Sequence, residues 1–181
     1  MRKLTAGLFS SVDGVVQDPF KFQFDSFDEE LGNGLDDMMR RTDTVVLGRV
    51  SYQEWAGYWP TATDEFGNFI NPVQKFVASR TLTGELEWQN SQLIDGDLED
   101  FVRKLKGGTG GDIAVCGSIS VVRQLLFAGL LDSLTVMFHP VIAGPGRRLF
   151  GPEDPTTRLE LQQSQITSKG NAVLQYGLLR E

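Results

Sequence analysis

Segments with strand-like patterns of apolar residues alternate with helix-like segments along most of this 181-residue chain. Leu4, Ala6 and Leu8 recur with period two, as in a half-buried strand. Residues 98–105 instead place apolar side chains at i, i+3, i+4 and i+7, as in an amphipathic helix. Repeated alternation of strands and helices favours an α/β domain with a mostly parallel central sheet.

The same patterns predict the remaining elements and a single domain over residues 1–181. Two S-x-x-E capping boxes, at residues 26–29 and 51–54, predict helix starts. Residues 60–71 are expected to form a loop that is long enough to be a lid or a pocket wall. An antiparallel hairpin over residues 159–179 is expected to close the sheet. The other expected strands are 4–8, 44–47, 73–79, 86–88, 92–94, 113–116 and 134–142.

Composition excludes several classes of protein. Seventeen basic against twenty-four acidic residues give a net charge of −7, which argues against nucleic-acid binding because that depends on neutralising phosphates. One cysteine, Cys116, excludes an intrachain disulfide and a thiolate metal cluster, and no metal site is expected. The absence of 18 consecutive apolar residues argues against a membrane span. We expect a cytoplasmic protein that binds neither membrane nor nucleic acid.

Three expected strands end in similar polar segments. Residues 44–47 lead into Gly48-Arg-Val-Ser51, residues 73–78 into Ser79-Arg-Thr81, and residues 113–116 into Gly117-Ser-Ile-Ser120. Ligands of α/β sheets bind beyond the carboxyl ends of the strands, where glycine permits close approach and helix N-termini attract anions.

Two of these segments carry an arginine. Arg49 and Arg80 would place two guanidinium groups on one edge of an acidic protein, which suits a phosphate monoester such as the 2′-phosphate of NADP. The alternative for each segment is structural: glycine as a turn residue, serine as a helix cap, arginine as a solvated surface residue. The chain contains neither a Rossmann G-x-G-x-x-G motif nor a P-loop.

An ordered set of motifs resembles the dihydrofolate reductase-like superfamily. Within it, the chain is most similar to the reductase domain of the riboflavin-biosynthesis deaminase–reductase and its stand-alone bacterial relatives. The matching motifs are S-x-D-G at 11–14, L-G-R-x-[ST]-Y at 47–52, Y-W-P at 58–60, S-R-T at 79–81, G-S at 117–118, and a stretch from Gly129-Leu-Leu-Asp132 through Pro140-Val-Ile-Ala-Gly144 to Leu149-Phe-Gly151.

The resemblance implies a three-layer dihydrofolate reductase-like domain, usually dimeric, that uses NADPH. In the family reaction, hydride passes from the nicotinamide to the anomeric carbon of a pyrimidine ribosylamine 5-phosphate. Gly48, Arg49 and Ser51 would then hold a cofactor phosphate, and Ser79, Arg80 and Thr81 the adenosine end with its 2′-phosphate. Gly117, Ser118, Ile119, Ser120 and Val121 would cradle the pyrophosphate, while the first strand and the Asp13-Gly14 loop would flank the nicotinamide.

Other functions remain open beside this one. One histidine and one cysteine cannot supply the zinc ligands of a deaminase, so deamination is excluded. No carboxylate lies in the apolar stripe of the first expected helix, which disfavours folate reduction, although Glu30 flanks the stripe and is a candidate substrate-binding residue. The alternatives are therefore an NADPH-dependent reductase of another pyrimidine- or pterin-like heterocycle, dihydrofolate included, and a nucleotide-binding domain without turnover.

Single residues also allow two interpretations each. Asp13, the candidate catalytic residue, could approach the substrate or could order the loop over the nicotinamide. Trp59 could stack against a planar substrate or pack with Trp55 in the core. His139 could transfer a proton or serve as a hydrogen-bonded structural histidine. The sequence does not indicate which residue donates the proton, and water can supply it instead.

Overall fold

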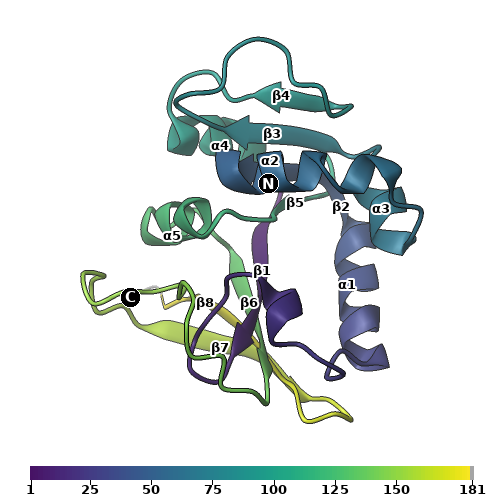
Figure 1. The fold of residues 1–181 in the computed structure, drawn as a ribbon. Coiled ribbons are helices and arrows are strands. Elements are labelled where there is room, and N and C mark those ends of the chain that lie inside the picture. The colour runs from purple at the N-terminus through teal and green to yellow at the C-terminus, as the bar shows by residue number, and fades with distance from the viewer. Residues whose placement is uncertain (180–181) are drawn as a thin grey trace.

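A computed structural model of the protein describes residues 1–179. Its centre is an eight-stranded sheet in the order β4-β3-β2-β5-β1-β6-β8-β7 (Figure 1). The strands from β4 to β6 in that order are parallel, whereas β8 and β7 are antiparallel to their neighbours. The expected mixed, mostly parallel sheet with a closing hairpin is confirmed. The strands are β1 (Leu4–Ser11), β2 (Thr42–Gly48), β3 (Gln74–Ala78), β4 (Ser91–Leu93), β5 (Asp112–Val115), β6 (Ser133–His139), β7 (Leu159–Ile166) and β8 (Ala172–Leu178).

Helices cover both faces of the parallel part of the sheet. Helices α4 and α5 pack on one face, and α1, α2 and α3 on the other, so that α5 and α1 lie on opposite sides of the strands (Figure 1). On β2, Val45 and Leu47 enter one core while Val46 enters the other, and all three are fully buried. The strand therefore reads as an uninterrupted apolar run. The α-helices are α1 (Glu29–Arg41), α2 (Arg49–Ala56), α3 (Glu65–Ile70), α4 (Leu98–Gly107) and α5 (Ile119–Phe127), with short 3-10 helices at Pro19–Lys21 and Trp59–Thr61.

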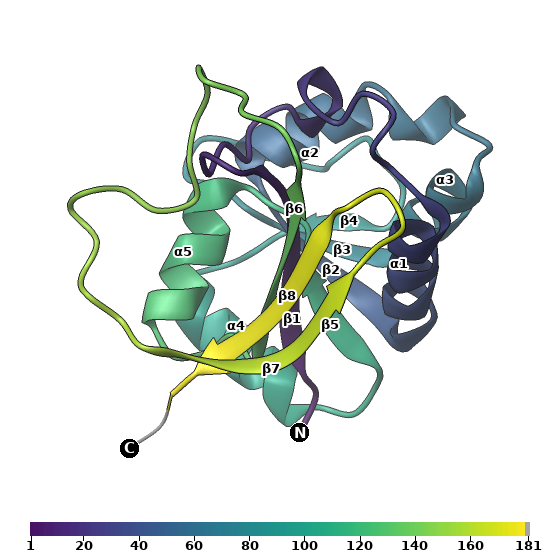
Figure 2. The ribbon, with the colours of Figure 1, turned by 90° about the horizontal axis from the view of Figure 1, so that it is seen from below.

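The hairpin of β7 and β8 extends the sheet beyond β6 (Figure 2). Because β8 starts opposite Phe138, the turn before it lies at the carboxyl ends of the parallel strands. Strand β6 ends at His139 rather than at Ile142 as expected, and the next residue, Pro140, has no N–H for the ladder. None of the helices in residues 1–179 is long and apolar enough to cross a membrane.

Two expectations about segments on the α3 side of the sheet were wrong. Residues 86–88 form no strand. Trp88 is instead buried in the core, where its indole N–H donates to Asn71 Oδ1 at 2.8 Å. Residues 60–71 are not a structureless loop, because they contain most of a 3-10 turn and all of α3, whose cap Asp64 accepts the Gly67 amide at 2.8 Å.

Both capping boxes were also misassigned. The cap of α1 is Asp28, which accepts the Leu31 amide at 3.1 Å, while the Ser26 hydroxyl contacts His139 Nδ1 at 2.6 Å. Helix α2 begins directly after Gly48, so Ser51 lies inside its first turn. The residues at the two N-cap positions are therefore Asp28 and Gly48, not the serines of the two S-x-x-E patterns.

Candidate functional site

The carboxyl ends of β2 and β5 meet in a close backbone contact. The Gly48 amide donates a hydrogen bond to the Gly117 carbonyl oxygen at 2.9 Å. A Cβ atom on Gly48 would lie less than 3.0 Å from the Ser118 hydroxyl, and one on Gly117 would lie 2.6 Å from the Ser51 hydroxyl. Gly117 also has a φ of +103°, which side chains rarely adopt. Glycine at both positions therefore allows these two polar segments to come together.

Two helix N-termini open at this contact. Helix α2 starts after Gly48 and α5 starts after Ser118, and the first amides of a helix have no acceptor within the helix. The Ser118 and Ser120 hydroxyl oxygens lie 3.0 Å apart beside the start of α5. Backbone N–H groups, positive helix ends and hydroxyls thus share one place at the sheet edge, and this combination binds anions.

The predicted residue Val121 differs from its neighbours on α5. Its amide donates to the Ser118 carbonyl at 3.0 Å, and its side chain is buried in the core with α5. The α5 backbone groups that remain for a ligand are therefore those of Ile119 and Ser120.

The third polar segment continues the same edge. Gly48 is the register partner of Ala78, so Ser79 and Arg80 follow β3 immediately beside the start of α2. The Ser79 hydroxyl accepts the amides of Thr81 and Leu82 at 3.1 and 2.9 Å, which fixes this turn. The exposed side chain of Arg80 extends from the fixed turn.

Both candidate phosphate-binding arginines are available to a ligand. Arg49 is exposed and donates to the neutral Gln53 side chain at 2.8 Å. The ion pairs found within residues 1–179 include neither Arg49 nor Arg80. The residues present therefore fit a phosphorylated dinucleotide: glycines at the closest approach, open amides and hydroxyls, and two uncompensated guanidinium groups.

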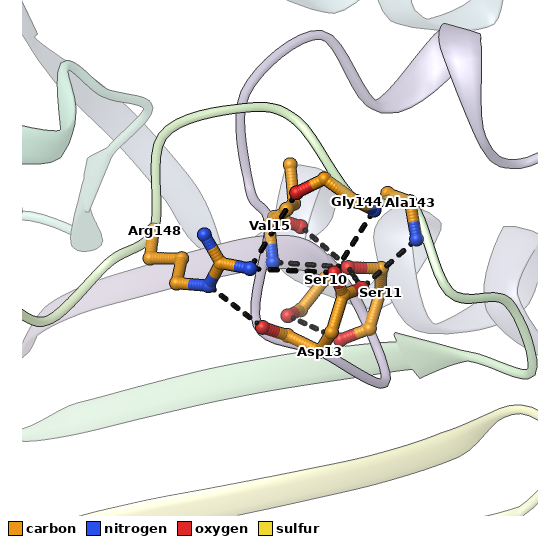
Figure 3. A network of polar contacts seen from close by, with 7 residues as sticks. All are labelled: Ser10, Ser11, Asp13, Val15, Ala143, Gly144 and Arg148. Atoms are coloured by element: carbon orange, nitrogen blue, oxygen red, sulfur yellow. Dashed lines mark hydrogen bonds and ion pairs between the residues drawn. The ribbon is translucent and has the colours of Figure 1, made fainter.

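Asp13 has a different environment (Figure 3). Its carboxylate accepts hydrogen bonds from the Ser11 hydroxyl at 2.7 Å and from the Ala143 and Gly144 amides at 2.9 Å each. The Ser11 bond, with help from the two amides, lowers the pKa of Asp13 to about 2. The carboxylate is ionised at neutral pH and cannot donate a proton. Its contacts therefore favour the interpretation that Asp13 orders the loop over the interpretation that it approaches the substrate.

The two candidate substrate-binding residues contact the hairpin turn and neighbouring aromatic rings. Both carboxylate oxygens of Glu30 accept hydrogen bonds from Ser168 in the hairpin turn, from its amide at 3.0 Å and its hydroxyl at 2.9 Å. Trp59 packs among aromatic rings, with centroids 4.8 Å from Phe66 and 4.9 Å from Tyr58. The packing of Trp59, which also contacts Trp55, agrees with its structural alternative. A role for either residue in substrate binding stays a prediction.

Sequence reasoning did not anticipate the partners of Asp13 and His139. Residues 140–149 were part of the family resemblance, yet their motif carried no signal that two of its amides bind Asp13. His139 is fully buried, between Ser26 at Nδ1 and Gln23 at Nε2, and burial lowers its pKa. The structural interpretation of this histidine therefore fits its surroundings.

Within residues 1–179 no group of three acidic, histidine or cysteine side chains is arranged to hold a metal ion.

Comparison with known proteins gives a family and a fold. Residues 2–174 match the model of the RibD C-terminal domain. The Bacillus subtilis protein YyaP is 30% identical over 148 residues, which cover 79% of this chain and 78% of YyaP. A candidate riboflavin biosynthesis protein of Shewanella sp. PV-4 has a similar structure, with a TM-score of 0.79 at 19% identity, over 98% of this chain and 99% of that one. Dihydrofolate reductase from Enterococcus faecalis, complexed with NADP(H), gives a TM-score of 0.62 at 17% identity, over 98% and 97% of the two chains. The expected dihydrofolate reductase-like fold is confirmed.

Proposed function

The chain belongs to the RibD C-terminal domain family, and we propose that it is an NADPH-dependent reductase of the riboflavin-pathway type. The observation that carries the proposal is the contact between Gly48 and Gly117, which places two helix N-termini and the β3 turn at one sheet edge. No carboxylate contacts the arginines of this edge within the part of the chain that the structure describes. A ligand with several phosphate groups suits it.

Each segment has a defined role in this proposal. Gly48, Arg49 and Ser51 bind one phosphate at the start of α2, and the amides at the start of α5 bind the pyrophosphate. Ser79 fixes the turn from which Arg80 reaches the 2′-phosphate. The carboxyl end of β1 pairs with β6 and extends beyond the residues that pair with β5, and in this proposal it flanks the nicotinamide. Bound NADPH supplies a hydride, which we propose goes to the anomeric carbon of a ribosylamine-substituted pyrimidine. Asp13 stays ionised, so water supplies any proton required.

The cofactor part of the proposal is tested by comparing NADPH with NADH. If Arg49 and Arg80 hold the 2′-phosphate, NADPH should bind well over tenfold more tightly, because a hydrogen bond to a charged group contributes about 1.5–3 kcal/mol. Equal affinities, measured by titration of the intrinsic tryptophan fluorescence, would remove this argument.

The substrate part is tested by genetic rescue. Growth without riboflavin of a host that lacks only the reductase step would support reduction of the pyrimidine ribosylamine. Failure to rescue, together with NADPH oxidation on pterin or other heterocyclic substrates, would identify a different reductase. Tight NADPH binding without oxidation of any substrate in the panel would indicate a domain without turnover.

The expected homodimer and the expected cytoplasmic location stay predictions. Light scattering after size-exclusion chromatography tests the homodimer.

A further inference from the structure

The Asp13 carboxylate joins two loops that are far apart in the sequence. One is the connection after β1, and the other is the segment of residues 140–149 after β6 (Figure 3). Besides the Ala143 and Gly144 amides, Asp13 binds Arg148, which donates from Nε to the Asp13 carbonyl at 2.9 Å and from Nη2 to the carboxylate at 3.4 Å. We call this set of contacts, made by Ser11, Asp13, Ala143, Gly144 and Arg148, the Asp13 clamp.

Backbone bonds continue the pairing on both sides of the clamp. The Val12 amide donates to the Val141 carbonyl at 2.8 Å, and the Val16 amide donates to the Arg147 carbonyl at 2.9 Å. A Cβ on Gly146 would lie less than 3.0 Å from the Val15 side chain, so the second loop approaches the first as closely as glycine allows. The two loops therefore form one unit at the ends of β1 and β6.

Burial contributes little to holding the outer parts of this unit. Val12 is 64% exposed and Ile142 is 78% exposed, although both are large apolar residues. With little apolar surface removed from water there, hydrogen bonds restrain the outer loop positions: those of the ionised Asp13 carboxylate and the backbone bond between Val12 and Val141. The lowered pKa of Asp13 agrees with this strong set of donors.

The unit lies at the edge of the sheet formed by the carboxyl ends of the parallel strands, which is also the edge of the proposed cofactor site. Strand β1 lies between β5, which carries the Gly117–Ser118 segment, and β6, which carries the 140–149 segment. We propose that Asp13 is a positioning residue, with Arg148 as its partner, and that the clamp fixes the loop after β1 against the nicotinamide end of the bound cofactor. This inference rests on the proposed NADPH-dependent function and assigns Asp13 no contact with reacting atoms.

Three variants test the clamp. Asp13→Asn replaces one acceptor oxygen with an NH2 group that faces N–H donors, and Arg148→Met keeps the side-chain stem but removes the guanidinium. Asp18→Asn is the matched control, because Asp18 lies in the same connection but, within residues 1–179, its carboxylate binds only Lys21, at 2.7 Å through an exposed ion pair. Hydrogen exchange of residues 141–148 should be at least tenfold faster in Asp13→Asn, faster to a smaller degree in Arg148→Met, and unchanged in Asp18→Asn.

Two ligands separate a positioning role from general damage. Adenosine 2′,5′-bisphosphate carries only the adenosine end of the cofactor, whereas NADPH carries both ends. In Asp13→Asn we expect the affinity for NADPH to fall at least tenfold and the affinity for the bisphosphate to change less than threefold. Asp13→Glu, which retains the charge, should recover part of the NADPH affinity.

Each other outcome contradicts a specific statement. Equal losses of both ligands in Asp13→Asn, or no loss of either, would overturn the clamp as a positioning device while leaving the proposed function intact. A wild-type chain that binds neither ligand would overturn the proposed function, and the role of the clamp with it.

Discussion

The Gly48 amide and the Gly117 carbonyl oxygen are joined by a 2.9 Å hydrogen bond between the ends of β2 and β5. The bond unites two segments that lie about seventy residues apart in the sequence, and the proposed cofactor site is built around it. Neither glycine can accept a side chain without displacing a serine hydroxyl.

Gly48→Ala should therefore damage the site. The new methyl group would push against Ser118, so we expect NADPH affinity to fall at least tenfold and the free energy of unfolding to fall by about 1–3 kcal/mol. Cofactor titration and urea denaturation measure the two effects. Gly34→Ala is the control: Gly34 lies in α1 with open space around it, and alanine there should raise stability by about 0.5–1 kcal/mol. Unchanged NADPH affinity in Gly48→Ala would show that the cofactor site does not depend on the contact between Gly48 and Gly117.

Arg80→Ala should reduce the preference for NADPH over NADH. The arginine has no acidic partner within residues 1–179, so its removal should cost NADPH about tenfold in affinity and leave NADH binding within about threefold. Arg103→Ala, on α4 and paired there with Glu99 and Asp100, serves as the control and should change neither affinity. A preference that survives in Arg80→Ala would assign 2′-phosphate recognition to another residue.

Stability should fall in mildly acidic solution because of His139, the only histidine of the chain. Burial lowers its pKa in the folded state below the ordinary value of 6.5. The unfolded chain therefore binds a proton near pH 6.5 that the folded chain does not bind, and the free energy of unfolding decreases as the pH falls below this value. Urea denaturation at pH 5, 6, 7 and 8 should show this decrease in the wild type. His139→Gln should be flatter from pH 8 to pH 6, and an equal slope in both proteins would exclude His139 as its source.

Lys75→Met should destabilise the fold. The Lys75 ammonium group is fully buried and donates to the carbonyl oxygens of Ile70, Asn71 and Val73 at 2.8, 3.0 and 2.8 Å. Methionine fills the space but leaves these acceptors without a donor, so we expect a loss of about 2–4 kcal/mol in denaturation experiments. The exposed Lys104→Met on α4 should change stability by no more than about 0.5 kcal/mol.

The sequence predicts most elements correctly where local pattern and tertiary packing agree. Helix α4 forms where the apolar stripe of residues 98–105 predicts it, and its cap Asp97 accepts the amides of Glu99 and Asp100. Prediction fails where a distant residue intervenes. Ser26 has the spacing of a helix cap, but its hydroxyl contacts His139, 113 positions away. Residues 86–88 have the apolar pattern of a strand, but that pattern reflects the burial of the Trp88 side chain in the core.

The candidate site divides in the same way. The polar ends of β2, β3 and β5 could be anticipated as neighbours, because parallel strands bring their carboxyl ends to one edge. The bonds from Ala143 and Gly144 to Asp13 could not, because they depend on backbone amides 130 residues away and no side-chain pattern marks an amide.

The half-buried Cys116 makes the chain convenient to study. Burial raises its pKa to about 12, so almost none of it is present as the reactive thiolate at neutral pH. Since it is the only cysteine, a second cysteine introduced at an exposed position, such as Val12 or Ile142, would be the preferred point of attachment for a maleimide fluorophore. Loop movement during ligand titration could then be followed from one labelled position, without first removing the natural sulfhydryl.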